Sequence, residues 1–279
     1  MRDATHRQLR ALARAALCCA VLARSFAGGP SAPTVAEELR AARLMEAALA
    51  ARRAEPAEWS RLGAIYAELC AKHPRDAAVR NARGEFLWDR GEHARAVAEW
   101  ETVEQLDATH ATALHHLGGA HLAAADTRKS AAYLRRASDA APANASYHYE
   151  LANVLFLFRH DLKDATTDEA AVIDSAMQHY AAASRLAPLD TEYARAYAET
   201  FYSVPKADWN TALAAWKRLL EISPRKEFAL SNLTRIHLRL GQRDAAQACL
   251  DKIQSIDLER LKGKLQEQID RLPEKKPGL

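Results

Sequence analysis

Small and large apolar residues recur along this chain with a fixed long period. The pattern is clearest in residues 111–144, and a shift of 34 residues brings similar residues into register. Shifted toward the N-terminus, Gly118 falls on Gly84 and Leu134 falls on Trp100. Because a constant period of this length is typical of stacked supersecondary units, the pattern predicts an array of repeats.

The composition favours helices throughout. Alanine and other helix formers dominate, glycine and proline are few, and runs of Val, Ile and Thr with alternating polarity are absent. The chain is therefore expected to be all-α. One column marks the ends of successive units, with spacings of 34, 34, 46, 36 and 34 residues: Pro74, Ala108, Pro142, Pro188, Pro224 and Leu258.

These columns resemble the tetratricopeptide repeat (TPR), a helix–turn–helix unit of about 34 residues. The resemblance implies a right-handed α-solenoid of about six repeats. A degenerate first repeat is expected at 43–76, followed by repeats at 77–110, 111–144, 145–190, 191–226 and 227–260, a capping helix at 261–272 and a tail at 273–279. Small residues should lie where helices cross, with large neighbours beside them, which gives the packing set Gly84, Ala96, Trp100, Gly118, Ala176, Tyr180, Ala212 and Trp216.

The repeat at 145–190 departs from the period, because it holds twelve extra residues around 160–174. Thr167 followed by Asp168 and Glu169 has the pattern of a helix start. The second helix of this repeat is expected to begin there and to run about two turns longer than its neighbours. In the next repeat, Pro205 is expected to end the first helix.

The resemblance also implies a concave groove lined by the first helix of each repeat. The groove is expected to be aromatic and aliphatic in its middle and polar at its ends, and to bind a protein or peptide. It lacks the Lys, Asn and Arg clamp with which some members of the family hold a C-terminal carboxylate. The candidate groove residues are Trp88, His115, Leu122, Tyr149, Asn153, Phe156, Arg195, Tyr202 and Arg235.

The run VLFLF at Val154–Phe158 is unusually apolar. Helical geometry directs Leu155 and Phe158 inward, and Phe156 and Leu157 toward the groove. Two interpretations are open. The insertion covers this patch, or the patch is a binding hot spot that the insertion helps to form.

The N-terminus has the layout of a secretory signal. Four arginines precede a short apolar stretch at residues 15–23, and small residues precede Gly28. Cleavage is expected after Ala27, with a linker at 28–34 and export to the periplasm or beyond the cell. The alternatives are an amphipathic first helix or an uncleaved anchor. No further membrane span is expected after cleavage.

The net charge and the cysteines bear on the kinds of partner and cross-link that are expected. Without residues 1–27 the chain holds 34 basic and 35 acidic residues, so no cationic surface for nucleic acid is expected. Cys70 and Cys249 lie in distant repeats, and they are expected to be apolar side chains without an intramolecular disulfide.

No motif for catalysis or metal binding is apparent. The chain lacks a nucleophile motif, a phosphate-binding loop and HExxH, and the acidic insertion lacks the glycine of a calcium loop. The sequence therefore predicts a non-catalytic scaffold without cofactor or metal. The alternatives are a structural homo-oligomer and an assembly factor for envelope complexes. One histidine group has spacings that do not suit a metal site on a helix: His110, His115, His116 and His121.

Overall fold

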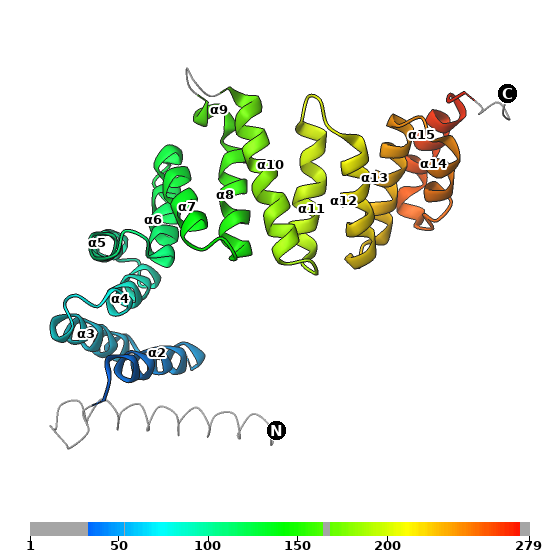
Figure 1. Ribbon diagram of the computed structural model, residues 1–279. Helices are drawn as coiled ribbons and strands as arrows, with labels where there is room; N and C mark the ends of the chain where they lie inside the picture. Colours follow the sequence, from blue (N-terminus) through cyan, green and yellow to red (C-terminus); the bar gives the residue numbers. More distant parts are fainter. Residues whose placement is uncertain (1–32, 53, 164–167, 274–279) are drawn as a thin grey trace, which may run out of the picture. The chain divides into compact units, whose positions relative to one another are not determined.

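The structure, a computed structural model, describes residues 33–52, 54–163 and 168–273. These residues form fourteen α-helices and two 3₁₀ turns, with no strand among them, so the prediction of an all-α chain is confirmed (Figure 1). The chain divides after Ala125 into two units, and each is described by itself. The expected signal peptide at 1–27 and most of the linker at 28–34 lie outside the described residues.

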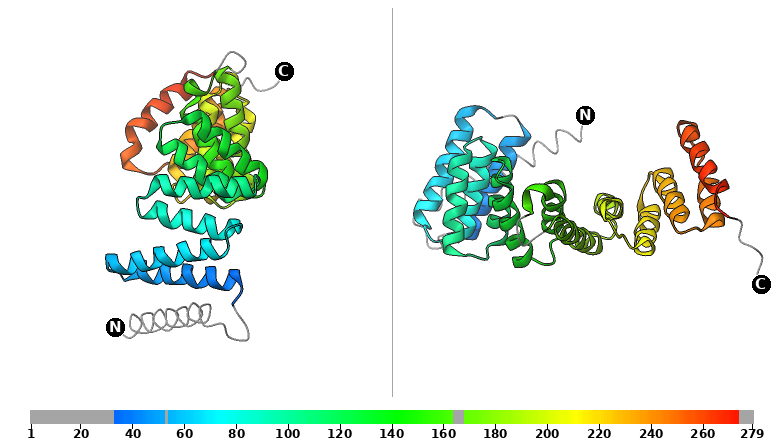
Figure 2. Two further views of the ribbon diagram at one scale, coloured as in Figure 1. Left: turned by 90° about the vertical axis from the view of Figure 1, so that its left-hand side faces the viewer. Right: turned by 90° about the horizontal axis from the view of Figure 1, so that it is seen from above.

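The described part of the N-terminal unit contains five antiparallel helices, and each packs against the next (Figures 1 and 2). They are α2 (Val35–Ala51), α3 (Pro56–Lys72), α4 (Ala77–Asp89), α5 (His93–Leu106) and α6 (Ala111–Ala123).

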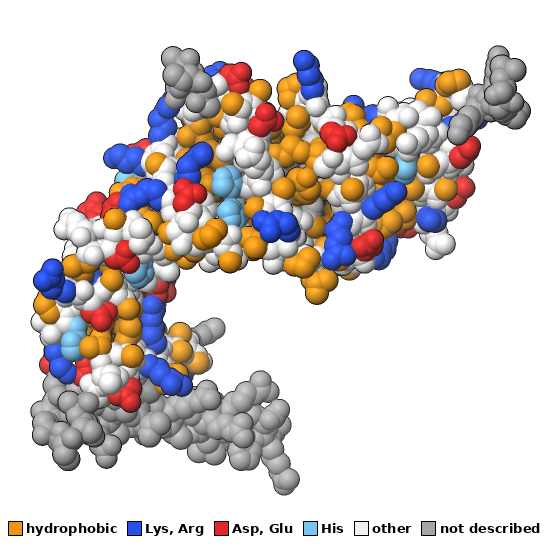
Figure 3. All heavy atoms as spheres, viewed as in Figure 1, with side chains coloured by type: hydrophobic (Ala, Val, Ile, Leu, Met, Phe, Trp, Pro, Cys, Tyr) orange, Lys and Arg blue, Asp and Glu red, His pale blue; other side chains and the backbone are white. Residues whose placement is uncertain are grey.

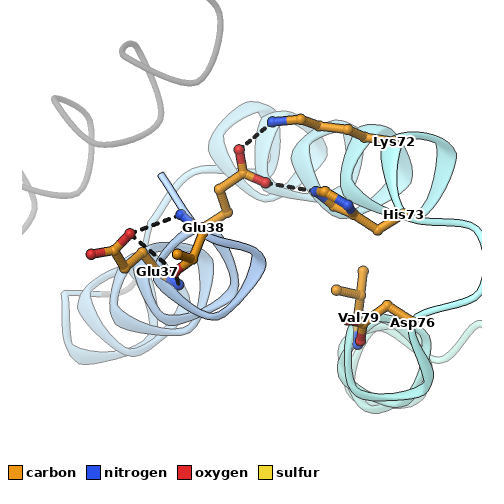
Figure 4. A network of polar contacts seen from close by, with 7 residues as sticks. Glu37, Glu38, Lys72, His73, Asp76 and Val79 are labelled. Atoms are coloured by element: carbon orange, nitrogen blue, oxygen red, sulfur yellow. Dashed lines mark hydrogen bonds and ion pairs between the residues drawn. The ribbon is translucent and has the colours of Figure 1, made fainter. Parts of the chain in front are cut away.

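Polar contacts fix the start of α2 (Figure 4). The Thr34 backbone N–H donates to Glu37 Oε2 at 2.8 Å, and the Glu37 N–H donates to Thr34 Oγ1 at 3.3 Å, which is a reciprocal cap. One residue on, the buried Glu38 forms an ion pair with Lys72 and lies 2.9 Å from His73 Nε2. Because Glu38 reaches the end of α3, it holds the first two helices together.

The crossing of α4 and α5 depends on a glycine. Trp100 is only 2% exposed, and its ring lies against Gly84. A Cβ at position 84 would come within 2.8 Å of Trp100 Cδ1 and Cε2, closer than side chains tolerate. The large ring therefore requires the small residue opposite it.

The C-terminal unit is also built from helices that pack against their neighbours along the chain (Figure 2). Its helices are α7 (Thr127–Ala140), α8 (Ala145–Leu157), α9 (Arg159–Leu162), α10 (Glu169–Leu186), α11 (Thr191–Thr200), α12 (Trp209–Ile222), α13 (Lys226–Arg239), α14 (Arg243–Leu250) and α15 (Glu259–Asp270), with 3₁₀ turns at Phe201–Ser203 and Ile256–Leu258. One core cluster joins Ala198, Phe201, Ala212 and Trp216. At the C-terminal end, Leu265 and Ile269 of α15 pack on Leu230 and Leu250.

The insertion folds differently from the prediction. Helix α10 begins after Asp168, whose side chain accepts from the Ala171 N–H at 2.8 Å. It has 18 residues against 14 in α7 and α12, so it is about one turn longer and not two. The reason is that Arg159–Leu162 form the separate short helix α9. The predicted cap residue Thr167 lies outside the described residues.

Two further helix ends differ from the prediction. Helix α11 ends at Thr200 and not near Pro205, because the buried Phe201 starts a 3₁₀ turn that carries the chain out of the helix. The capping helix spans Glu259–Asp270 and not 261–272. No helix in the described ranges combines the length and the apolarity needed to cross a membrane.

Candidate functional site

Three predicted groove residues lie together along α8, around Tyr180 of α10. The Tyr180 hydroxyl donates to Asn153 Oδ1 at 2.7 Å. The Tyr180 ring lies 5.9 Å from the Tyr149 ring and 6.3 Å from the Phe156 ring, measured between centroids. Tyr180 itself is buried. A side chain predicted for packing therefore holds the three groove side chains in place.

Tyr193 of α11 extends this group. Its ring centroid lies 4.6 Å from that of Tyr149, whose hydroxyl donates to Glu192 at 2.7 Å. We call Tyr149, Asn153, Phe156, Tyr180 and Tyr193 the tyrosine cluster. Burial raises the pKa of Tyr180, and partial burial followed by the hydrogen bond to Glu192 raises the pKa of Tyr149. Both phenols are therefore neutral hydrogen-bond donors at neutral pH.

The insertion contacts the cluster through Arg159. Its guanidinium carbon lies 5.4 Å from the centre of the Phe156 ring, Nη1 donates to the Phe156 carbonyl at 2.9 Å, and Nε donates to Glu169 at 2.9 Å. The rest of α9 packs against α7, α8 and α10, and Arg128 donates to the Lys163 carbonyl at 3.0 Å. Within its described part, the insertion covers Phe156 through Arg159.

The VLFLF run is divided between interior and surface. Leu155 is 4% exposed, whereas Leu157 is 64% exposed. Phe156 and Phe158 are half-buried. The patch is thus neither wholly core nor wholly open, and Leu157 is its freely accessible part.

Three other predicted groove residues lie in or near the later repeats of the C-terminal unit. Arg195 is exposed and pairs with Glu199 at 3.2 Å. Tyr202 lies on the 3₁₀ turn after α11. Both the Tyr202 hydroxyl and Arg235 Nη1 donate to Asn232 Oδ1, each at 3.2 Å. Arg195 therefore has an acidic partner, and Arg235 has a neutral one.

The predicted groove residues of the N-terminal unit are less alike. Trp88 is half-buried, and its ring centroid lies 5.6 Å from that of Trp100. His115 is half-buried beside His116, with 5.5 Å between ring centroids. Leu122 is half-buried near the end of α6. All residues of the predicted packing set are buried: Gly84, Ala96, Trp100, Gly118, Ala176, Tyr180, Ala212 and Trp216.

A network of charged side chains in the N-terminal unit was missed at the sequence level. Glu85 forms an ion pair with Arg43 and lies 3.0 Å from His116 Nε2, and Asn81 donates to it at 2.8 Å. Burial alone would raise the pKa of Glu85, but hydrogen bonds from His116 and Arg43 outweigh it and lower the pKa to about 2. His116 also stacks on Trp100, with 4.7 Å between ring centroids. We call Arg43, Asn81, Glu85 and His116 the Glu85 network.

The two cysteines within the described ranges are free thiols. Cys70 is buried in α3, and Cys249 is half-buried in α14. Burial raises the pKa of both thiols. Neither therefore has the thiolate character of a reactive cysteine.

No protein-family model matches the chain, and neither does any curated protein. Among solved structures, the chain is similar to YrrB, described as a TPR protein with an unusual peptide-binding site, at 20% identity over 72% of this chain and 97% of that one, with a TM-score of 0.55. It is also similar to PilF of Pseudomonas aeruginosa, at 16% identity over 84% and 97% of the two chains, with a TM-score of 0.53. MamA matches at 16% identity over 67% and 93%, with a TM-score of 0.50.

These similarities confirm the resemblance stated from the repeat columns. The chain has the tetratricopeptide repeat fold.

Proposed function

We propose that this TPR chain is a non-catalytic scaffold that binds a peptide or a segment of another protein on the groove side of its C-terminal unit. The tyrosine cluster is the main contact. The observation that carries the proposal is the way buried Tyr180 holds Tyr149, Asn153 and Phe156 on one side of α8.

The chemistry of the cluster suits recognition. Tyrosine offers a large apolar face, a polar tip and few rotatable bonds, so little conformational entropy is lost when a partner binds. Tyr149 and Tyr193 are half-buried and touch each other, so their rings are already oriented. A peptide-binding site is described for the similar protein YrrB. That description supports the same class of partner for this chain.

We also propose that the chain is exported to the bacterial envelope. The support is the arginine-rich start and short apolar stretch within residues 1–27. N-terminal sequencing of the protein recovered from the envelope should begin at Gly28. Recovery of the full-length chain from the cytoplasm alone would contradict this location. A more specific form of this proposal is that the chain helps to assemble a complex in the envelope.

A capture experiment tests the scaffold proposal. The mature chain is immobilised, and capture from an envelope extract is compared for the parent, Phe156→Glu and Leu189→Glu. Leu189 is 77% exposed in the turn before α11, so it controls for an added charge on an apolar surface residue. Phe156→Glu should abolish capture, because it puts a charge into a desolvated contact, and Leu189→Glu should not.

The fold must be checked in the same variants. Phe156→Glu should keep the helical circular dichroism and melting of the parent, whereas Leu155→Glu should unfold the repeat, because Leu155 is buried. Equal unfolding by both variants would show that Phe156 is core and would end the hot-spot proposal. The competing homo-oligomer is tested by light scattering, where a dimer mass that Leu157→Glu reduces to a monomer would favour self-association.

A further inference from the structure

The C-terminal unit contains a second concave feature, away from the tyrosine cluster. It is a cavity of about 620 Å³ between α13 and the capping helix α15. That volume lies within the roughly 300–1,000 Å³ typical of ligand pockets. We call it the cap pocket. The lining residues that matter for its chemistry are Arg235, Leu238, Arg239, Leu261, Lys264 and Leu265.

The cationic side of the cap pocket has no acidic partner among the residues that the structure describes. Arg235 donates to the neutral Asn232, at 3.2 Å. The Arg239 guanidinium lies 4.4 Å from the centre of the Trp209 ring. Lys264 forms no ion pair within the ranges that the structure describes. No aspartate or glutamate is among the described residues that line the cavity.

Other arginines of the chain do have carboxylate partners. Arg80 and Arg83, for example, both pair with Glu99, at 3.0 and 2.7 Å. Three like charges around one cavity repel one another and create a positive potential inside it. An anionic group that enters would relieve this repulsion, so the pocket favours a ligand that carries carboxylates.

The other side of the cap pocket is apolar. Leu261 and Leu265 stand four residues apart on α15, on the same face as Lys264, and Leu238 faces them from α13. Leu265 is buried, whereas Leu238 and Leu261 are half-buried and can still contact a ligand. Figure 3 shows the same mixture more broadly, with Lys and Arg side chains beside hydrophobic ones over α11 to α13.

From this combination we propose that the cap pocket binds an acidic peptide segment of a partner protein. Its carboxylates lie against Arg235, Arg239 and Lys264, and an adjacent apolar side chain lies on Leu238 and Leu261. A peptide satisfies both sides at once. A nucleic acid would leave the leucines uncovered, and the chain without residues 1–27 has no basic excess to attract it. This site rests on the proposed scaffold function, since Tyr202 and Arg235 are also predicted groove residues, but it does not depend on the tyrosine cluster.

The probe is a fluorescein-labelled peptide with the sequence Glu-Asp-Leu-Glu-Asp-Leu, measured by fluorescence anisotropy with the mature chain. Its counterpart carries Gln and Asn in place of Glu and Asp. The acidic peptide should bind at least tenfold more tightly than the neutral one, and the difference should shrink at high salt. Equal binding of the two peptides, or no binding of the acidic one at millimolar protein, would overturn the proposal.

Variants locate the binding. Lys264→Glu should weaken binding of the acidic peptide at least tenfold, and Arg235→Glu should do the same. The matched control is Lys262→Glu, which makes the same change on α15 at a lysine that pairs with Glu259 and does not line the pocket. It should stay within about twofold of the parent. Equal weakening by Lys262→Glu and Lys264→Glu would show attraction to net charge only and would overturn the site.

Two further measurements separate this inference from other outcomes. Phe156→Glu should leave binding of the acidic peptide unchanged, so loss of the tyrosine-cluster proposal would not affect this one. A fluorescein-labelled oligouridine of the same charge should bind at least tenfold more weakly than the acidic peptide. Tighter binding of the oligouridine would overturn the choice of a peptide. Circular dichroism of each variant confirms that it is folded.

Discussion

Two groups of charged side chains, one in each unit, differ in their partners. In the N-terminal unit, Glu85 is bonded to Arg43 and His116, so its charge is matched by neighbours. In the C-terminal unit, Arg235 and Lys264 line a cavity to which no described residue contributes a carboxylate. A charge with neighbouring partners stabilises the fold, whereas a charge without one is available to a ligand. The comparison therefore supports a structural role for Glu85 and its partners, and the proposed role in ligand binding for Arg235 and Lys264.

The aromatic residues follow the same division. Trp100 is enclosed between Gly84 and the ring of His116, and it is almost wholly buried. Tyr149 and Tyr193 contact each other but remain half-buried. The large ring of the N-terminal unit thus fills the interior, and the tyrosines of the C-terminal unit present part of their surface.

The largest effect is expected from Trp100. Trp100→Ala should lower the free energy of unfolding by about 3–5 kcal/mol, because it opens a large cavity. Tyr149→Ala should cost only about 1 kcal/mol, because its ring is partly exposed. Urea denaturation of the whole chain measures both. Similar losses for the two variants would break the division between interior and surface aromatics.

A glycine pair controls for the packing around Trp100. Gly84→Ala should destabilise the chain, since the added Cβ would collide with the ring of Trp100. Gly119→Ala is the same change on α6, at a glycine where a Cβ meets nothing within 4 Å. It should stabilise the chain by roughly 0.5–1 kcal/mol, because alanine favours helix. The test is whether Gly84→Ala lowers the free energy of unfolding while Gly119→Ala raises it.

The second prediction concerns the matched and unmatched charges directly. Glu85→Ala should lower the free energy of unfolding by about 2 kcal/mol, because His116 loses its carboxylate and Arg43 keeps only Glu46, at 3.7 Å. Lys264→Ala should change it by no more than about 0.5 kcal/mol, because no ion pair is lost. Both values come from urea denaturation at neutral pH and low salt. A larger loss for Lys264→Ala would mean that the lysine is structural and not available to a ligand.

Repetition is what made the fold predictable from the sequence. Stacking imposes the same small and large residues on each unit, so the columns containing Gly84, Trp100, Ala212 and Trp216 could be read without a structure. The insertion has no counterpart in other repeats, and its division into α9 and a shorter extension of α10 could not be read in the same way. The 3₁₀ turn at Phe201–Ser203 is likewise decided by tertiary packing, because Phe201 is buried in the core.

The candidate site was only partly predictable. The expected helix face does bring Tyr149, Asn153 and Phe156 together, because residues four and three apart share a face. The Glu85 network was missed because Arg43 lies 42 residues from Glu85 in sequence and His116 lies 31 residues from it, each on a different helix. The cap pocket was missed because Lys264 lies in a segment that was predicted only to be a capping helix. The unpaired state of its neighbours becomes visible only in three dimensions.

The third prediction concerns acid. Burial, followed by the charges of His148 and Arg135, lowers the pKa of His179 to about 4, while Asp139 opposes this weakly. The Nδ1 atoms of His148 and His179 lie 2.9 Å apart. In the unfolded state His179 binds a proton near pH 6.5, whereas in the folded state it stays neutral until the pH is lower. The contribution of neutral His179 to stability is therefore complete above pH 6.5 and is lost as the pH falls toward 4.

Glu85 provides the contrasting case in the N-terminal unit. Its pKa is lowered from 4.5 to about 2, so its contribution is present above pH 4.5 and is lost as the pH falls toward 2. Each group should contribute about 1–2 kcal/mol after screening by solvent. The midpoint of urea unfolding is measured from pH 7 to pH 2. His179→Gln should flatten the curve between pH 6.5 and 4, and Glu85→Gln should flatten it between pH 4.5 and 2. If His179→Gln flattened the curve below pH 4 and Glu85→Gln flattened it above pH 4.5, the assignment of each pH range to its residue would be wrong.

The last prediction compares one hydroxyl in each unit. Tyr66 is wholly buried and donates to the carboxylate of Glu46 at 2.7 Å, whereas Tyr180 donates to the amide of Asn153 at the same distance. Hydrogen bonds to charged groups contribute about 1.5–3 kcal/mol and those between neutral groups about 0.5–1.5 kcal/mol. Tyr66→Phe should therefore cost about 1 kcal/mol more than Tyr180→Phe in urea denaturation at pH 8. With Glu46→Gln as the background, the cost of Tyr66→Phe should fall to that of Tyr180→Phe, because the acceptor is then neutral. If Tyr66→Phe and Tyr180→Phe lower the free energy of unfolding equally, the charge of the acceptor makes no difference to these two hydrogen bonds. The contrast between a charged group in the N-terminal unit and a neutral cluster in the C-terminal unit then does not extend to them.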